Sequence, residues 1–538
     1  MKLSVYASTA CQRASSEFSR VKRMARCAVV GAVAFAINST CLASATFLPS
    51  RKQIIDPLGN VRVIVDFHDK AHLGFPGRDR EMPNSEPKRP PEPEFFHKEQ
   101  TVALVADFEA RHGVKRMGMT SWAGSSVTVY VSNEKLARIL QDPLVRQVSE
   151  DEEFSFSAFA PPWYDYNYSP EWMSWGGDAT NAKVSSGSSG RKIYIIDSGT
   201  ALHDDLPTFA ARLNVACGSS GNCNTSDPTT YPLVGCWAHA THVAGIIGAK
   251  AAGANKTTRG VYAGFPNLIS LNITSRSGGS YDCSNTSPSS STVGYALDYI
   301  SWDNSNNNPT KIIHVANISL NPGGMEYINL GVPGTNWTKA RSVAGGIWWG
   351  GIQLVAGTLL VQSSGNWPSV GGTSKDACNY AYRPGYLTPP TASDGILVVG
   401  AVNDNGAAVS AASPFQAADP SSLNTLAAYE QSTYGECVEI WAPGDRIVST
   451  WGSHSSPYSV NGTTYTGNVY ASGVTQGWAF LSGTSMAAPH VAAIAAWLAD
   501  NNAVTTSAEL EALVRASATQ HGGAVDPAGY PVKVPRLP

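Results

Sequence analysis

The apolar residues that follow position 190 are grouped into short, uninterrupted runs. Runs of about four to eight aliphatic or β-branched residues are typical of parallel strands that are buried on both faces. Segments that are apolar almost all round predict buried helices instead. The predicted strands are 192–197 and 359–364. The predicted helices are 237–248 and 486–499, followed by a surface helix at 507–514. This alternation predicts an α/β domain with a mostly parallel central sheet.

The pattern before position 150 is different, because strands that alternate apolar and polar residues are mixed with amphipathic helices. The predicted elements are strand 61–67, helix 102–111, strand 127–131, helix 134–141 and strand 144–148. Residues 82–94 are rich in proline and charge, which predicts a loop or a disordered insertion. A small α+β domain is therefore expected ahead of the α/β domain. From Thr519 on the chain is rich in Gly and Pro, and no additional C-terminal domain is expected there.

The first 45 residues have the pattern of a secretory signal peptide. Basic residues, among them Arg20, precede an apolar run at 27–37. This run is too short to span a bilayer, which needs about 20 residues. An Ala-x-Ala site ends at Ala45, where we expect cleavage. Cys41 suggests a lipoprotein as the alternative, but Asn38 stands three residues before it, where an apolar residue is expected.

Composition limits the partners and the compartment. The charged content is 15% and the formal net charge is −3, so no basic excess points to nucleic acid. Three of the nine cysteines lie in the signal segment. The remaining six form an even number in an exported chain, which implies disulfides and disfavours a metal cluster. Sequence alone leaves their pairing open. We expect a secreted or periplasmic monomer that has no contact with the membrane once the signal is cleaved.

Ser485 is a candidate nucleophile. Two small residues lead into it, and the predicted buried helix follows at once. A hydroxyl at a helix start lies near the positive end of the dipole and near free backbone N–H groups. The commoner role of such a serine is that of an N-cap, and this alternative stays open for Ser485 taken alone.

Two further segments complete a set with this serine. Asp197 ends a predicted buried strand, at the edge of the sheet where active sites collect, although an Asx-turn is the common role of Asp-Ser-Gly. His239 lies near the start of a predicted buried helix. His242 follows three residues later, and two such histidines could bind a metal. No third ligand stands at a suitable spacing, so one of the two is expected to be a packing residue.

The chain order Asp, His, Ser differs from that of α/β-hydrolases and of chymotrypsin and is the order of subtilisin. The segments Asp-Ser-Gly, His-Ala-Thr-His-Val-Ala-Gly and Gly-Thr-Ser-Met-Ala-Ala-Pro-His occur in that order. Over residues 192–516 the chain therefore resembles the subtilisin-like serine peptidases (subtilases), especially the proteinase K and aqualysin type. The resemblance implies the subtilisin-like three-layer α/β fold, in which the segments 268–273, 315–320 and 438–442 are further strands.

The resemblance also implies the function and the residues that carry it. The expected activity is hydrolysis of peptide bonds in polypeptide substrates by a secreted serine endopeptidase, through an acyl-enzyme. Asp197, His239 and Ser485 correspond to the catalytic triad, and the Asn366 side chain and the Ser485 N–H to the oxyanion hole. The residues that correspond to the substrate cleft are Ser319, Leu320, Ser363, Ser364 and Gly365. No cofactor is required for this chemistry.

The N-terminal region resembles the subtilase propeptide, a chaperone and inhibitor whose tail lies in the cleft. This implies a signal peptide at 1–45, a propeptide at 46–155 and a peptidase domain at 156–538. The propeptide would then act as an intramolecular inhibitor of the peptidase domain in the same chain. Self-cleavage is expected after the acidic cluster 150–153, somewhere within 154–165.

Comparison with the aqualysin type also suggests a disulfide scheme. Cys236 with Cys283 and Cys378 with Cys437 match the two expected pairs. This leaves Cys217 with Cys223. Structural calcium is possible, because relatives bind it through loop carboxylates. Asp204, Asp205 and Asp227 are candidates, although no spacing identifies a site and surface acids are usually solvated.

Two departures from the family pattern affect the cleft. Ala240 follows His239 where the family usually has Gly, and a methyl group there could crowd a close contact. After Leu320 the chain continues with Asn321 and a long segment through Gly357 that contains three tryptophans. The resemblance therefore does not transfer the subsite preference.

Two other functions remain open at this stage. A catalytically inactive subtilase fold could serve as a binding protein, although such a chain would usually have lost one of the four site residues. An esterase could use the same triad. Labelling by a serine phosphonate tests the first alternative, and casein compared with a short ester tests the second.

Overall fold

The computed structural model describes a large part of the chain. The described residues are 45–48, 53–68, 98–122, 125–151, 154–156, 159–163, 174–185, 187, 190–200, 203, 205–215, 238–250, 259–274, 288–322, 327–329, 339–341, 357–367, 375–377, 393, 395–411, 414–415, 431–451, 458–460, 463–465 and 477–538. They belong to the second of two compact units, Ser44–Pro538. Residues 1–44 of the predicted signal peptide and the Pro-rich segment 82–94 lie outside them. Within these ranges no helix is long and apolar enough to cross a membrane.

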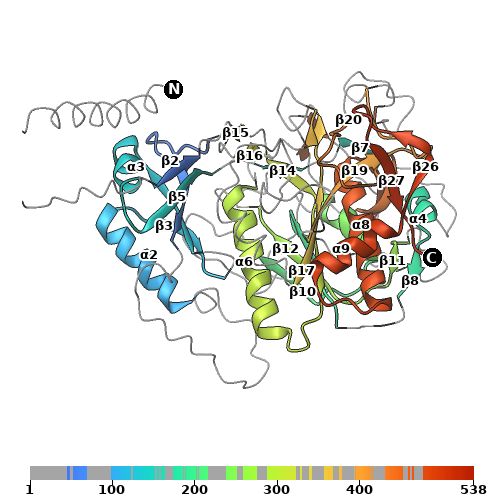
Figure 1. Cartoon of the computed structure of the whole chain (residues 1–538), viewed down its shortest axis with the longest axis horizontal. Coiled ribbons are helices and arrows are strands. Elements are labelled where there is room, and N and C mark those ends of the chain that lie inside the picture. The colour runs from blue at the N-terminus through green and yellow to red at the C-terminus, as the bar shows by residue number, and fades with distance from the viewer. Residues whose placement is uncertain are drawn as a thin grey trace, which may run out of the picture. The chain divides into compact units, whose positions relative to one another are not determined.

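A parallel sheet of seven strands forms the centre of the larger domain (Figure 1), in the order β10-β12-β9-β13-β17-β19-β21. The strands are β9 (Ile193–Asp197), β10 (Ala211–Asn214), β12 (Leu268–Asn272), β13 (His314–Ile318), β17 (Thr358–Ser363), β19 (Ile396–Val402) and β21 (Ile440–Pro443). The five predicted strands are all present. Strands β10 and β19 were not predicted, although Ile396–Val402 is an apolar run like the others.

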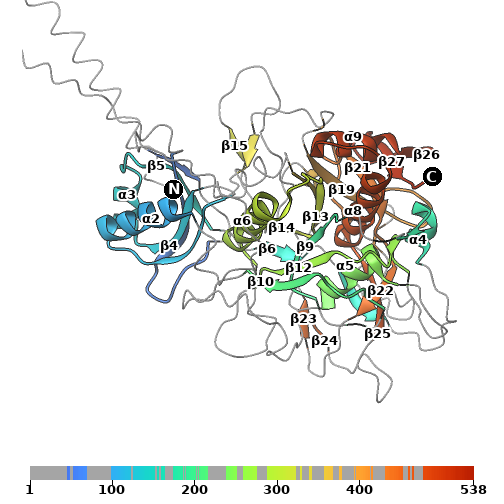
Figure 2. The same ribbon diagram turned by 90° about the horizontal axis from the view of Figure 1, so that it is seen from below.

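Helices cover both faces of this sheet, which confirms the predicted three-layer α/β fold. The helices are α5 (Ala238–Gly248), α6 (Ser290–Asn307), α8 (Thr484–Asn501) and α9 (Ser507–Ala516). Ile193 and Ile195 of β9 pack with α5, α8 and α9, whereas Tyr194 and Ile196 pack with α6. Successive residues of a strand point to opposite faces, so the two helix layers lie on opposite sides of the sheet (Figure 2).

The N-terminal domain is a second sheet with two helices, as predicted. Its strands have the order β1-β5-β2-β4-β3. The elements are β1 (Thr46–Leu48), β2 (Val61–Phe67), α2 (Glu99–His112), β3 (Arg116–Thr120), β4 (Ser126–Val131), α3 (Asn133–Ile139) and β5 (Val145–Glu150). Val63, Phe108 and Val129 are among the residues of its separate hydrophobic core. Helix α6 lies between β3 of this domain and β9 of the central sheet (Figures 1 and 2).

The segment after Ala516 forms a hairpin that the sequence analysis did not predict. Strands β26 (Ala518–Val525) and β27 (Pro531–Pro535) pair antiparallel, and β27 packs against β21. Val532 is fully buried in a small apolar cluster with Trp441. The Leu537 N–H donates to the Thr180 carbonyl at 3.0 Å. This segment is therefore part of the packing of the larger domain.

The remaining described elements are short. They are β6 (Phe154–Phe156), β7 (Phe159–Trp163), α4 (Trp175–Thr180), β8 (Lys183–Val184), β11 (Tyr262–Ala263), β14 (Leu320–Pro322), β15 (Tyr327–Asn329), β16 (Lys339–Arg341), β18 (Asn366–Trp367), β20 (Gln431–Ser432), β22 (Ile447–Trp451), β23 (Tyr458–Val460), β24 (Thr463–Tyr465) and β25 (Gly477–Ser482). Strand β6 pairs with β14, and β7 joins β25 and β22 in a small antiparallel sheet. These pairs border the carboxyl edge of the central sheet, where the candidate residues lie.

Candidate active site

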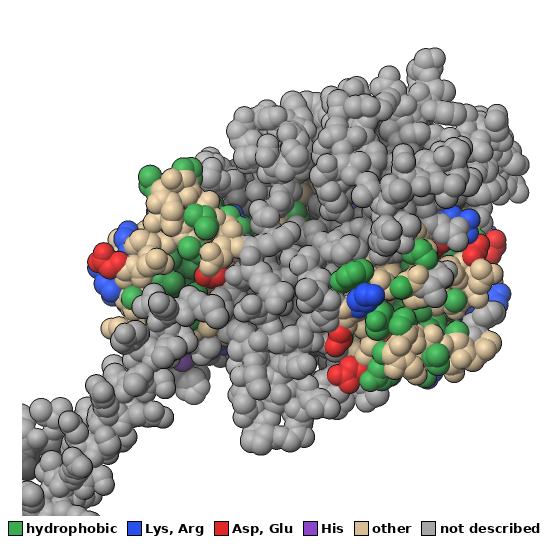
Figure 3. Space-filling view, turned by 90° about the horizontal axis from the view of Figure 1, so that it is seen from above, with side chains coloured by type: hydrophobic (Ala, Val, Ile, Leu, Met, Phe, Trp, Pro, Cys, Tyr) green, Lys and Arg blue, Asp and Glu red, His purple; other side chains and the backbone are tan. Residues whose placement is uncertain are grey.

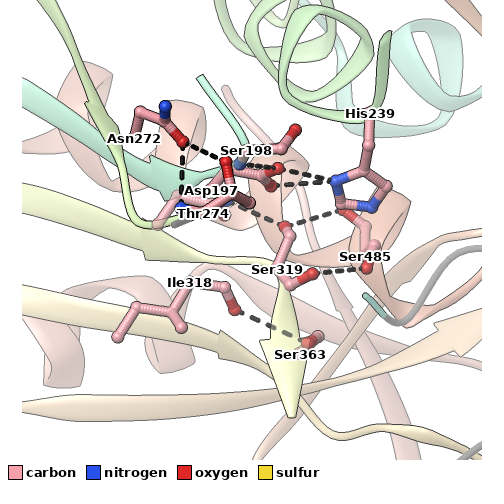
Figure 4. A network of polar contacts seen from close by, with 10 residues as sticks. Asp197, Ser198, His239, Asn272, Thr274, Ile318, Ser319, Ser363 and Ser485 are labelled. Carbon is pink, nitrogen blue, oxygen red and sulfur yellow. Dashed lines mark hydrogen bonds and ion pairs between the residues drawn. The ribbon is translucent and has the colours of Figure 1, made fainter. Parts of the chain in front are cut away.

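Three different elements bring the candidate catalytic residues together (Figure 4). Asp197 is the last residue of β9, His239 is the second residue of α5, and Ser485 is the second residue of α8. Strand ends and helix starts meet at the carboxyl edge of a parallel sheet, which is where α/β proteins build their sites. The structure thus gathers residues that are separated by almost 300 positions in the chain.

Asp197 holds the imidazole of His239. The Nδ1 atom of His239 lies 2.9 Å from both carboxylate oxygens of Asp197. Asp197 is fully buried and also accepts the Ser198 backbone N–H at 2.6 Å. A carboxylate only accepts, so Nδ1 carries the proton and Nε2 is left as the basic nitrogen. Figure 4 shows Ser485 beside the far edge of this ring.

The hydroxyl of Ser485 is held by Ser319. Ser485 Oγ donates to the Ser319 carbonyl at 2.7 Å, and Ser319 Oγ donates in return to the Ser485 carbonyl at 2.9 Å. The Asn317 amide donates to Ser319 Oγ at 2.8 Å. A hydroxyl has one proton, so its transfer to an imidazole requires that the bond to Ser319 be exchanged for one to His239. Ser319 therefore positions the backbone and the side chain of Ser485.

Ser485 is not the N-cap of its helix. The N-cap is Gly483, whose φ of 153° is a conformation that favours glycine. The helix begins at Thr484, two residues before the predicted start. The N–H of Ser485 therefore belongs to the first turn, where backbone donors lack partners within the helix. This N–H group lies in the same residue as the candidate nucleophile.

Asn366 is fully buried and is oriented by Thr484. Its Oδ1 accepts the Thr484 N–H at 3.0 Å and the Thr484 hydroxyl at 2.9 Å. The two donors identify the oxygen end of the amide, so Nδ2 is the donor end of this side chain. This role of Thr484 was not predicted from the sequence. Its place beside Ser485, with a hydroxyl in an otherwise apolar helix, was the available signal.

The predicted cleft residues lie at the ends of β13 and β17. Ser319, Leu320, Ser363, Ser364 and Gly365 are buried in the full chain. Asn321 ties the two segments together, because its amide donates to the Ser363 carbonyl at 2.8 Å and accepts the Ser363 hydroxyl at 2.9 Å. Gly365 has a φ of 109° and donates to the Thr484 hydroxyl at 3.2 Å. Asn321, noted as a departure in the sequence, thus links the two strand ends.

Two other histidines, His242 and His490, lie in the same two helices as His239 and Ser485, and both are buried packing residues. His242 is fully buried, with Nε2 3.0 Å from the Ile447 carbonyl, as expected for a packing residue. His490 places Nδ1 2.7 Å from the Met486 carbonyl, and burial lowers its pKa to about 4. A Cβ on Gly176 would lie 2.3 Å from His490 Nε2, so the glycine provides room for the ring. Neither histidine is placed for catalysis.

The expectation of structural calcium stays a prediction. Among the described residues, no group of three or more His, Cys, Asp or Glu side chains could hold an ion. Asp204 and Asp227 lie outside the described residues. Asp205 is 1% exposed, so it is not the solvated surface acid that its sequence context suggested.

The Ala240 methyl group lies fully buried in α5. The tight approach to this helix occurs at Gly245, where a Cβ would meet Ser449 Oγ at 2.2 Å. Three tryptophans of the segment after Leu320 lie outside the described residues: Trp337, Trp348 and Trp349.

Of the six cysteines, only Cys437 lies within the described residues, and it is disulfide-bonded. The others, Cys217, Cys223, Cys236, Cys283 and Cys378, lie outside them. The three pairings therefore stay predictions.

Charge on the described surface is mixed. Figure 3 shows acidic and basic side chains near one another among apolar and other groups. Within the coloured part of this face they do not form the one-sided basic patch of nucleic-acid-binding proteins. This distribution agrees with the net charge of −3.

The sequence pattern of the subtilase family matches residues 188–530, well over half of the chain. The chain belongs to the subtilase family. It is accordingly a serine endopeptidase. The thermostable alkaline protease of Halalkalibacterium halodurans is 26% identical over 399 residues, which cover 73% of this chain and 77% of that protein. The extracellular serine proteinase of a Thermus species is 26% identical over 386 residues, covering 69% of this chain and 65% of that protein.

A solved structure supports the fold of this subtilase. Fervidolysin from Fervidobacterium pennivorans, described as a keratinolytic enzyme related to subtilisin, matches with a TM-score of 0.51. The match covers 91% of this chain and 62% of that one, at 16% identity. At this identity the match concerns the fold alone.

Proposed function

We propose that this subtilase is an exported, self-processing proenzyme that hydrolyses polypeptides through Asp197, His239 and Ser485. The observation that carries the proposal is the Asp197–His239 contact at 2.9 Å, with Ser485 at the start of a buried helix beside the ring. Export is supported by the signal-like segment at 1–45 and by a relative that is named extracellular. The further expectation of a monomer is tested by size-exclusion chromatography.

The chemistry follows from the positions of these groups. His239 Nε2 takes the Ser485 hydroxyl proton as Oγ attacks the peptide carbonyl. Asn366 Nδ2 and the Ser485 N–H donate to the oxyanion that forms. When the C–N bond breaks, His239 gives the proton to the departing amine. A water molecule then attacks the ester through the same base, which releases the acid and restores the hydroxyl. Throughout, Asp197 stabilises the charged imidazole.

The polypeptide is bound as an extended strand. Strand β14 begins at Leu320, directly after Ser319, and β6 of the same chain pairs with it antiparallel. Strand addition of this kind binds backbone groups and so accepts many sequences. The pairing at the edge of β14 thus supports the proposal that the substrates are extended polypeptides.

The N-terminal domain acts as an intramolecular inhibitor. Asp298 of α6 accepts the backbone N–H groups of Ser121 at 2.9 Å and Trp122 at 2.5 Å. Tyr295 of the same helix donates to the Thr128 hydroxyl at 2.8 Å. These buried polar groups are paired across the two domains, and breaking such pairs is costly. The contacts support a domain that stays bound to α6 after cleavage.

Asp151 makes a second connection between the domains. Its carboxylate accepts the Ser291 N–H at 3.0 Å and the Ser291 hydroxyl at 2.7 Å, in the first turn of α6. It also pairs with Arg62 at 2.6 Å and is fully buried. A negative charge at a helix N-terminus is favourable. The strand β6 that follows Asp151 occupies β14, the proposed substrate edge.

The test compares wild type with Ser485→Ala, using Ser517→Ala, a replacement in the loop after α9, as the matched control. We expect wild type and Ser517→Ala to cleave casein, to process their own chains and to react with a serine phosphonate. We expect Ser485→Ala to fold and do none of these. Activity of Ser485→Ala on casein would overturn the triad. Labelling without casein cleavage would favour an esterase, and absence of labelling in wild type an inactive binding protein. Activity after dialysis against a chelator would show that no metal is required.

A further inference from the structure

The main-chain pairing between β13 and β17 ends just before the active site. Its last pair is Ile318 with Gln362, and the next residues on each strand belong to the candidate site. Ser319, whose carbonyl accepts the Ser485 hydroxyl, comes directly after Ile318. On the other strand, Asn366 stands four residues after Gln362. Past this pair, the ladder no longer fixes the distance between the two segments.

The side chain of Asn321 joins the two segments beyond the end of the ladder. Its Nδ2 donates to the Ser363 carbonyl at 2.8 Å, and its Oδ1 accepts the Ser363 hydroxyl at 2.9 Å. That hydroxyl also lies 3.5 Å from the Ile318 carbonyl (Figure 4), a distance at which a hydrogen bond is weak. Asn321 and Ser363 are both fully buried. A buried polar pair whose bonds are made is rigid.

The main chain of Asn321 belongs to the edge on which a polypeptide strand lies. Asn321 is the middle residue of β14 and stands opposite Ser155 of β6 in the antiparallel pair. The same residue thus lies beside the paired polypeptide and holds, through its side chain, the segment that leads to Asn366. Thr484 orients the Asn366 amide from the side of α8, through two bonds to Oδ1. Together these contacts place the amide relative to the polypeptide edge.

We infer that Asn321 is a positioning residue that aligns the scissile carbonyl with the oxyanion donor Asn366. This inference rests on the oxyanion role proposed above for Asn366. The polypeptide is placed by β14 and the donor by the segment after Ser363, so the bonds between Asn321 and Ser363 set the distance between them. A displacement of about 1 Å at a reacting group can cost up to roughly 100-fold in rate. Asn321 contributes this alignment without touching the reacting atoms.

The first test removes the connection in steps and measures turnover of an extended peptide substrate. Asn321→Ala removes both bonds, and we expect kcat to fall about tenfold. Ser363→Ala removes only the hydroxyl bond and keeps the carbonyl acceptor, so the fall should be about threefold. KM should change by less than about twofold, because the backbone of β14 still pairs with the substrate. A rise in KM at unchanged kcat would overturn the inference.

Asn304→Ala is the matched control, because it breaks a similar bond at the opposite end of β17. Asn304 Nδ2 donates to the hydroxyl of Thr358, the first residue of that strand, at 2.7 Å. We expect this variant to lower the free energy of unfolding and to leave kcat unchanged. Equal falls in kcat for Asn304→Ala and Asn321→Ala would assign the effect to general loosening and reject the positioning role. If Asn321→Ala does not fold, Ser363→Ala is compared with Asn304→Ala instead.

A second test combines Asn321→Ala with Asn366→Ala. In the Asn366→Ala background, Asn321→Ala should lower kcat by less than about twofold, because the donor that it aligns is already gone. The full loss in both backgrounds would overturn this inference and leave the oxyanion role of Asn366 intact. If Asn366→Ala alone leaves kcat unchanged, the proposed oxyanion role fails and this inference fails with it. Active sites are counted with the serine phosphonate after each full-length chain has processed.

Discussion

The catalytic domain and the N-terminal domain both bury ionisable side chains, yet pH acts on the two domains in opposite directions. In the catalytic domain, burial lowers the pKa of His490 to about 4 and that of His314 to about 3. In the N-terminal domain, burial raises the pKa of Asp66 to about 7, against the attraction of Arg146. Gln147 Nε2 donates a long hydrogen bond to the Asp66 carboxylate, at 3.5 Å.

The sign of each effect follows from proton binding. A histidine with a lowered pKa binds protons better in the unfolded chain, so the catalytic domain loses stability as pH falls below about 6.5. A carboxyl with a raised pKa binds its proton better in the folded chain, so the N-terminal domain loses stability as pH rises from about 4 to about 7. At neutral and alkaline pH the peptidase therefore stays stable while its inhibitor is weakened.

The largest effect is expected from a substitution of Asn366, which should change the activity of the catalytic domain and leave the N-terminal domain unaffected. Asn366→Ala should lower kcat by a factor that corresponds to about 3–4 kcal/mol of activation free energy, because a donor to the oxyanion is lost. The stability of the N-terminal domain should stay unchanged. Steady-state kinetics with a peptide substrate measure kcat and KM. A loss confined to KM would contradict the role. Asn405→Ala, in a loop away from the site, is the control.

Asp66 tests the pH response of the N-terminal domain. The pKa shift to about 7 corresponds to roughly 3–4 kcal/mol that is lost between about pH 4 and pH 8. Asp66→Asn removes the charge, so the domain should keep its stability over this range. Hydrogen exchange of β2 and β4 is compared between the two proteins at each pH, both in the Ser485→Ala background. Equal protection of both proteins at pH 8 would contradict the expectation.

Asp298 tests the contact between the domains. Asp298→Ala leaves two buried N–H groups without this acceptor, and we expect the association to weaken by about 2–3 kcal/mol. The lag between self-cleavage and full activity should shorten, while the kcat of the fully active enzyme stays the same. Asp404→Ala, an exposed acid of the catalytic domain, is the control. An unchanged lag for Asp298→Ala would show that these bonds do not hold the inhibitor.

A smaller effect, on the stability of the catalytic domain between pH 7 and pH 5, is expected from His490. Between pH 7 and pH 5 the catalytic domain should lose about 2 kcal/mol through this residue, because the unfolded chain takes up the proton first. His490→Gln should flatten that part of the profile, measured by denaturant unfolding of the Ser485→Ala protein. An equally steep profile in the variant would assign the acid sensitivity to other groups, with His314→Gln as the next variant to measure.

The sequence predicted the parts of this molecule that local patterns encode. Asp197, His239 and Ser485 stand beside apolar runs and small residues. The sequence therefore predicted the strand and the two helices that carry them, and the order of the three residues along the chain. Helix α6 was missed, because serine and asparagine dominate its ends and its apolar residues form no clear stripe. Thr484 and Asp298 were missed for another reason. Their partners are distant in the chain, and only the folded arrangement brings these groups together.

The hairpin β26–β27 has a consequence for an enzyme that is surrounded by copies of itself. Peptidases attack frayed segments first. Here Nδ2 of Asn181, the C-cap of α4, donates to the main-chain oxygens of Leu537 and Pro538 at 2.9 and 3.0 Å, so residues 537–538 are held beside α4. The segment around α4 and the segment near residue 538 therefore protect each other. The hairpin would then extend the lifetime of the active enzyme by resisting self-digestion.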